Sequence, residues 1–161
     1  MNTLIRAHTL KSMAGSLVPN VGLTWLALRH SPQVPLMGPA PNLLTVLLPA
    51  AAMTALITVV LTYATIVAAR KRGELQPPLA ANATWLLPAG LLGLGLAALA
   101  AAVVAAGAWG LREPLATAQA DRLMLVLAAA TMGLLVALLA ALLATRQAQH
   151  LGNAPAVSLT N

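Results

Sequence analysis

Residues 43–69 read LLTVLLPAAAMTALITVVLTYATIVAA, a run of 27 residues without one charged side chain. An α-helix of this length is about 40 Å long, because each residue adds about 1.5 Å. The hydrocarbon core of a bilayer is about 30 Å thick, and roughly 20 apolar residues cross it. The run ends at three consecutive cations, Arg70, Lys71 and Arg72. This stretch predicts a transmembrane helix that is stopped and anchored by a basic cluster.

Three further apolar runs lie on either side of this stretch. Residues 85–110 and 123–145 are long enough to span a membrane, and a shorter, more polar run lies near residues 10–28. Together the four runs predict an all-α fold, an integral membrane bundle of four transmembrane helices in a single domain of residues 1–161. The polar residues 148–161 predict a frayed tail.

The run near residues 10–28 has two other interpretations. Arg6 and Lys11 precede its uncharged part, residues 12–28, as cations precede the apolar part of a secretory signal peptide, but no small-residue cleavage site follows Leu28. A helix that lies in the membrane interface is the second alternative.

The overall composition excludes an ordinary soluble domain. Hydrophobic residues make up 60% of the chain and charged residues only 7%, against roughly 25% charged residues in soluble domains. The net charge of +6 does not indicate a nucleic-acid partner, because the bases lie at the ends of apolar runs and form no stripe with aromatic residues. The predicted partner is the lipid bilayer.

The distribution of cations predicts the orientation. Four spans place six cations on one side of the membrane and three on the other. The six are Arg6, Lys11, Arg70, Lys71, Arg72 and Arg146, and the three are Arg29, Arg112 and Arg122. Because Lys and Arg are held on the cytoplasmic side of short loops, both termini are expected in the cytoplasm of a bacterium, with the chain in the inner membrane as a multi-pass protein.

Groups that carry catalysis or bind metals are scarce. No Asp, Glu, Lys, Arg or His lies within residues 12–28, 43–69, 85–110 and 123–145, and the chain has no cysteine. His8, His30 and His150 are far apart in the sequence, and His30 is expected on the opposite side of the membrane from the other two. Haem or metal ligation would need two or more of them to meet. The sequence therefore predicts neither an enzyme nor a cofactor.

Four polar residues inside the runs are candidate site residues. Asn20 follows a proline in the first run, and Thr54, Thr58 and Thr62 are spaced four apart, on one face of the long helix. These residues could line a path for a polar solute. Alternatively, they form interhelical hydrogen bonds or bond back to the preceding turn, and so fix the packing of the helices.

Aromatic residues near the ends of the runs predict membrane-interface anchors. These residues are Trp25, Tyr63, Trp85 and Trp109.

Small residues recur along the run at 85–110 and predict a helix-packing face, because small-xxx-small spacing lets two backbones approach closely. One row holds Gly93, Ala97, Ala101 and Ala105, and the neighbouring row holds Gly90, Ala98, Ala102, Ala106 and Gly110. The helix that packs on this face could belong to the same chain or to another copy.

The first 75 residues resemble small uncharacterised bacterial inner-membrane proteins with four spans. The resemblance rests on Asn20, the VPLMG loop at 34–38, Asn42 and the RKRGEL stretch at 70–75. It implies the four-span arrangement and no particular activity.

The expected function follows from these features. The small-residue face and the missing catalytic groups favour a non-enzymatic membrane protein that acts through helix packing, as an accessory subunit, a scaffold or a small homo-oligomer. The alternative is a small-solute permease that works as an oligomer, since four short helices enclose little volume alone.

Overall fold

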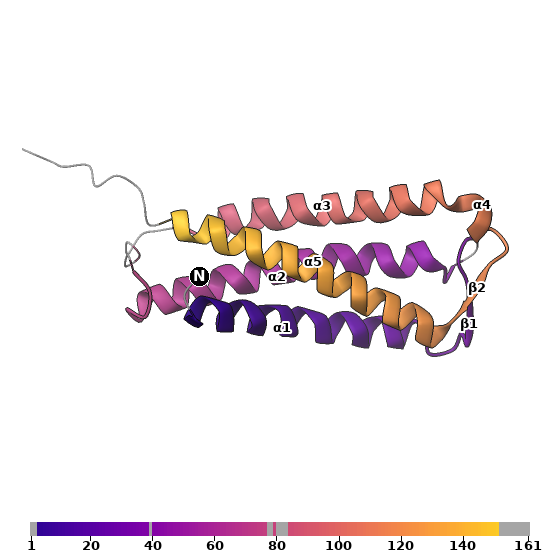
Figure 1. The fold of residues 1–161 in the computed structure, drawn as a ribbon, viewed down its shortest axis with the longest axis horizontal. Coiled ribbons are helices and arrows are strands. Elements are labelled where there is room, and N and C mark those ends of the chain that lie inside the picture. Colours follow the sequence, from indigo (N-terminus) through magenta and orange to yellow (C-terminus); the bar gives the residue numbers. More distant parts are fainter. Residues whose placement is uncertain (1–2, 39, 77–78, 80–83, 152–161) are drawn as a thin grey trace, which may run out of the picture.

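The computed structural model describes residues 3–38, 40–76, 79 and 84–151. Its elements, in chain order, are α1 (Thr3–Ala27), β1 (Gln33–Pro35), α2 (Leu43–Lys71), α3 (Leu86–Gly110), α4 (Arg112–Leu115), β2 (Gln119–Asp121) and α5 (Arg122–His150). The four long helices run alternately up and down, so that the start of α1 and the end of α5 lie at the same end of the bundle (Figure 1).

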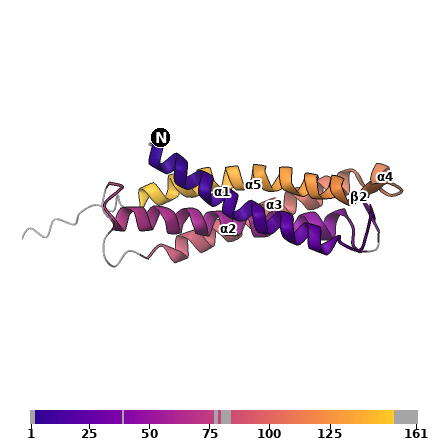
Figure 2. The same ribbon diagram turned by 90° about the horizontal axis from the view of Figure 1, so that it is seen from below.

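Helix α2 is central to the bundle. It packs against α1, α3 and α5, whereas α3 packs mainly on α2 and makes few contacts with α5. Figure 2 shows α1 crossing over α2 and α5, with α3 on the other side of α2. As a result, α2 has many buried residues and α3 has three, Ala89, Gly93 and Ala108.

Three of the described helices are long and apolar enough to cross a membrane. They are α2, α3 and α5, so the spans predicted over 43–69, 85–110 and 123–145 are confirmed as long apolar helices. Helix α1 is not in this group, because Lys11, Asn20 and Thr24 make it more polar. A fourth span near 10–28 stays a prediction.

The ends of these helices differ slightly from the predicted ends. Helix α2 continues through Arg70 and Lys71, and α1 begins at Thr3. Residues 148–150, predicted as part of a frayed tail, belong to α5, and Ala148 is buried. Residues 152–161 of that tail lie outside the described residues.

A short antiparallel ladder corrects the all-α expectation. Strand β1 pairs with β2 in the register Val34 opposite Ala120, which joins the α1–α2 connection to the α3–α5 connection. Pro35 favours an extended backbone at Val34, the residue before it. Val34 and Ala120 are buried together with Leu28, Val46 and Leu125. The ladder closes this end of the bundle over a small apolar cluster.

Asn42 begins α2 through a reciprocal capping box. Its side-chain oxygen accepts from the Thr45 N–H at 2.9 Å, and the Thr45 hydroxyl accepts from the Asn42 N–H at 2.9 Å. The Asn42 amide also donates to the Gly38 carbonyl at 2.6 Å. These bonds satisfy N–H groups that lack a partner within the helix, so the start of α2 is fixed against the preceding loop.

Gly93 sets the close approach of α3 to α2. A Cβ atom at this position would lie 2.8 Å from Leu56 Cδ1 and 3.7 Å from Val59 Cβ, whereas one at Gly107 would meet nothing within 4 Å. The absence of a side chain at Gly93 therefore lets the two helices pack closely.

We predict that Gly93→Leu destabilises the bundle by about 1–3 kcal/mol, because the new side chain overlaps Leu56 and Val59. Gly107→Leu, on the same helix, is the matched control and should leave the unfolding temperature within about a degree or two of the parent protein. Thermal unfolding in a mild detergent measures both. Equal unfolding temperatures for the two variants would contradict the proposed contact.

Candidate functional site

The predicted threonine face of α2 lies in the interior of the bundle. Thr54, Thr58 and Thr62 have exposed fractions of 1%, 0% and 1%. Asn20 and Thr24 of α1 and Thr145 of α5 are buried as well. Because α1 and α5 both pack against α2, polar groups from three helices enter an interior that is formed mainly by Ala, Val, Ile and Leu.

Several of these polar atoms have no hydrogen-bond partner within the part of the chain that the structure describes. They are Asn20 Nδ2, Thr54 Oγ1, Thr62 Oγ1, Tyr63 OH and Arg70 Nη1. A buried polar atom without a partner costs free energy, about 1–3 kcal/mol by mutational measures. The interior of this bundle is therefore more polar than its packing requires.

Other hydroxyls bond to their own helix, as the packing interpretation of the threonines expects. Thr65 donates to the Thr62 carbonyl at 2.9 Å, and Thr131 donates to the Leu127 carbonyl at 2.9 Å. Such a bond satisfies a hydroxyl without any neighbouring helix. Thr54 lacks one, which distinguishes it from the threonines at the helix surface.

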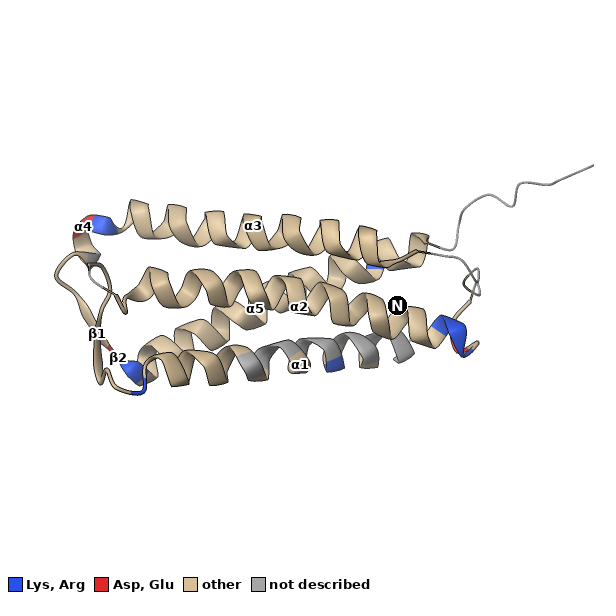
Figure 3. Ribbon diagram, turned by 180° about the vertical axis from the view of Figure 1, so that it is seen from behind, with Lys and Arg blue, Asp and Glu red and all other residues tan. Residues whose placement is uncertain are grey.

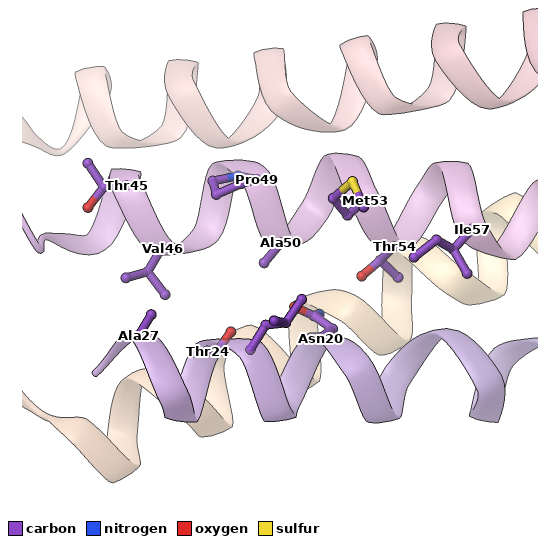
Figure 4. Close-up of a pocket in the computed structure, with 11 residues that line it drawn as sticks. Asn20, Thr24, Ala27, Thr45, Val46, Pro49, Ala50, Met53, Thr54 and Ile57 are labelled. Atoms are coloured by element: carbon purple, nitrogen blue, oxygen red, sulfur yellow. The ribbon is translucent and has the colours of Figure 1, made fainter. Parts of the chain in front are cut away.

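A groove of about 180 Å³ lies between α1 and α2, in the half of the bundle near the ladder. Its outer walls include Leu23 and Met53, both largely exposed, and Asn20, Thr24 and Thr54 are buried at its inner side. Figure 4 shows Asn20 and Thr54 directed from their two helices into the space between them. No lining residue carries a charge. The groove therefore offers a neutral, mostly apolar site with a few hydrogen-bonding groups.

A second groove, of about 220 Å³, separates α3 from α5. Leu96, Leu99 and Val103 line it from α3, and Met132, Leu135 and Leu139 line it from α5. All of its lining residues are apolar, so it can bind only an apolar chain or side chain.

The basic cluster at the end of α2 divides into two parts. Arg70 is buried, with 3% exposed, and donates from Nη2 to the Gln149 carbonyl at 2.8 Å. Cations favour the carbonyl end of a helix, so Arg70 ties α2 to the last turn of α5. Lys71 and Arg72 are exposed, and the hydrogen bond and charge of Glu74 raise the pKa of Arg72. Of the three predicted anchors, only Lys71 and Arg72 face outward.

One of the four aromatic residues, Tyr63, differs from the expectation, and an interface position of the other three stays a prediction. Trp25 packs under Arg122, with 4.1 Å from the guanidinium carbon to the ring centroid, and Trp109 packs under Arg112 at 4.8 Å. Both pairs lie at the ladder end of the bundle. Tyr63 is fully buried, which corrects its prediction as an interface anchor. It lies on the buried face of α2, one residue after Thr62.

The predicted small-residue face of α3 turns gradually from the interior to the outside. Gly93 is buried, Ala97 and Ala101 are half-buried, and Ala105 is exposed. Side chains four residues apart point in directions that differ by about 40° around the helix axis. A row with this spacing therefore winds slowly around the helix. Gly90 is half-buried, and a Cβ there would meet nothing within 4 Å. Only the first part of the row packs on α2.

The neighbouring row of α3 faces away from the rest of the chain. Ala98, Ala102 and Ala106 are exposed, and so is Gly95, where a Cβ would meet nothing within 4 Å. Figure 3 shows α3 at the edge of the bundle, with the cations of α2, α4 and α5 near the bundle's ends. The outer face of α3 is therefore apolar, small in its middle and uncovered by the residues that the structure describes.

These observations define the chain as a multi-pass helical membrane protein, since three of its described helices can cross a bilayer. Comparison of the chain with protein-family models, with curated proteins and with solved structures finds no match. Only the residues of this chain therefore bear on its function.

Proposed function

We propose that this chain is a non-enzymatic membrane protein that acts through helix packing, as an accessory subunit, a scaffold or a small homo-oligomer. The observation that carries the proposal is the uncovered row of Ala98, Ala102 and Ala106 on α3. Exposed leucines would not support it, because lipid chains solvate them as well as protein does. Small residues at four-residue spacing support it, because they let a second helix approach the backbone closely.

Gly95 of α3 also supports the proposal that a partner helix packs on this face. Gly95 lies in the interior of the helix, where glycine costs about 1 kcal/mol relative to alanine. Within the described chain it permits no close contact, unlike Gly93. A helix from a partner that packs against Gly95 and Ala102 would account for both the glycine and the small row.

We predict that Ala102→Leu weakens assembly at least about tenfold, since the larger side chain separates the two backbones. The measurement is oligomer size by light scattering, together with the proteins that co-purify, in a mild detergent. Ala128→Leu is the matched control, because Ala128 is exposed on α5 and outside the row. Assembly that is unchanged in Ala102→Leu, or equally weakened in both variants, would rule out the α3 face.

A small-solute permease that works as an oligomer is the second candidate. The buried threonine face of α2 and the unpartnered atoms of Asn20, Thr54 and Thr62 favour it. These groups could replace the hydration of a small neutral solute, and the described interior along Thr54–Thr62 has no charge to attract an ion.

For the permease, we expect glycerol or urea to cross proteoliposomes faster than protein-free liposomes. Replacing Thr54, Thr58 and Thr62 together with Val should slow this flux at least about tenfold, since three hydrogen-bonding groups are lost. Thr131→Val, at an exposed hydroxyl of α5, should leave the flux unchanged. Flux equal to that of protein-free liposomes would exclude this candidate for these solutes.

We also propose that the end of the bundle with Lys71 and Arg72 faces the bacterial cytoplasm, because more cations lie at that end.

The orientation is testable by matched single-cysteine variants, since the chain has no cysteine of its own. Gln76 and Gln119 are exposed, one near each end of the bundle. In intact cells with a permeable outer membrane, a membrane-impermeant maleimide should label Gln119→Cys and should label Gln76→Cys only after lysis. The opposite pattern would invert the orientation and leave the bundle unchanged.

A further inference from the structure

The groove between α1 and α2 combines apolar walls with two unpartnered polar groups. Asn20 has an exposed fraction of 6% and Thr54 of 1%, and neither Asn20 Nδ2 nor Thr54 Oγ1 has a hydrogen-bond partner among the described residues. Both residues line the groove and are directed into it (Figure 4). Valine at position 54 would have the same shape without the unpaired hydroxyl. Both atoms lie just beneath the groove surface, and a rotation of either side chain would present its polar group to a bound molecule.

The depth of these two groups limits which ligand can reach them. Thr54 lies three residues from Ile57, the midpoint of α2, and so about 5 Å along the helix axis from that midpoint. If α2 crosses the bilayer, Thr54 is near the middle of the hydrocarbon core. Lipid ester carbonyls and headgroups remain at the interface, about 10 Å away on the nearer side. The bound group must be able to dissolve in the hydrocarbon itself.

The lining of the groove limits the ligand further. It contains no charged residue, so the ligand is neutral. An acyl chain alone has no acceptor and would leave both polar groups unpaired. A volume of about 180 Å³ fits one ring, since an engineered cavity of about 150 Å³ binds benzene. Met53 and Leu23 are exposed at the outer side, where a tail could continue into the lipid.

We propose that the α1–α2 groove binds a neutral, lipid-soluble cyclic carbonyl compound of the benzoquinone type. Its ring lies between α1 and α2, and a carbonyl oxygen accepts hydrogen bonds from Asn20 Nδ2 and Thr54 Oγ1. Its alkyl tail leaves past Leu23 and Met53. This site does not depend on the packing proposal, because none of its lining residues belongs to α3, whereas it shares Asn20 and Thr54 with the permease candidate.

The test measures binding of a decyl-substituted benzoquinone to the protein in phosphatidylcholine nanodiscs, with protein-free nanodiscs as the reference. The expected result is one saturable site per chain beyond the amount that partitions into lipid. Thr54→Val keeps the side-chain shape and should weaken binding about three- to tenfold through the loss of one hydrogen bond. Ala50→Leu fills the groove and should abolish saturable binding.

Two controls separate the site from general effects. Thr65→Val removes a hydroxyl that bonds to its own helix and does not line the groove, so binding should stay unchanged. Decylbenzene has the ring and the tail without a carbonyl, so Thr54→Val should not alter its binding. The unfolding temperature of each variant shows whether the bundle is intact.

Three results would overturn the proposal. Binding equal to that of protein-free nanodiscs would mean that the groove holds water or its own side chains. Equal affinity of the parent protein and a folded Thr54→Val variant would exclude the hydrogen bond that defines the site. Loss of self-association in Ala50→Leu, without quinone binding by the parent protein, would assign the groove to a second copy of the chain.

Discussion

A hydrocarbon core supplies no hydrogen bonds, so the backbone N–H and C=O groups of α2 must find their partners within the protein. This constraint makes residues 43–71 one continuous helix, even though Pro49 lies inside it. Because α2 contacts each of the other long helices, their positions depend on its surface. Its buried Ala, Val and Thr residues form much of the interior, and the absence of a side chain at Gly93 lets α3 approach it closely.

The lack of hydrogen-bond partners in the hydrocarbon core also makes the unpartnered polar atoms in the interior costly. In water, an unpartnered hydroxyl at a helix surface costs nothing, but Asn20 Nδ2 and Thr54 Oγ1 are buried in a protein that lipid surrounds. Arg70 is an intermediate case, since its Nη2 donates to the last turn of α5 while its Nη1 has no partner among the described residues. A bundle made only to pack could satisfy every such group, as Thr65 does.

The sequence was sufficient to place three of the long helices, over 43–69, 85–110 and 123–145. An uncharged apolar run of more than about 20 residues is expected to form a helix that crosses the membrane. The sequence could not place the ladder, since the pairing of Val34 with Ala120 depends on how distant loops meet. The spacing of the threonines predicted a shared face, but which helix meets that face depends on packing. For the same reason, Tyr63 was misplaced at the interface, and the groove between Asn20 and Thr54 could not be foreseen.

The ladder has a consequence for how the chain is made. Val34 and Ala120 are 86 positions apart, so β1 has no strand to pair with until synthesis has passed residue 121. Helix α1, the most polar of the long helices, must keep its place beside α2 during that interval without the ladder. Biogenesis of this protein therefore has a late closing step, in which the first hairpin is secured only after α3 has been made.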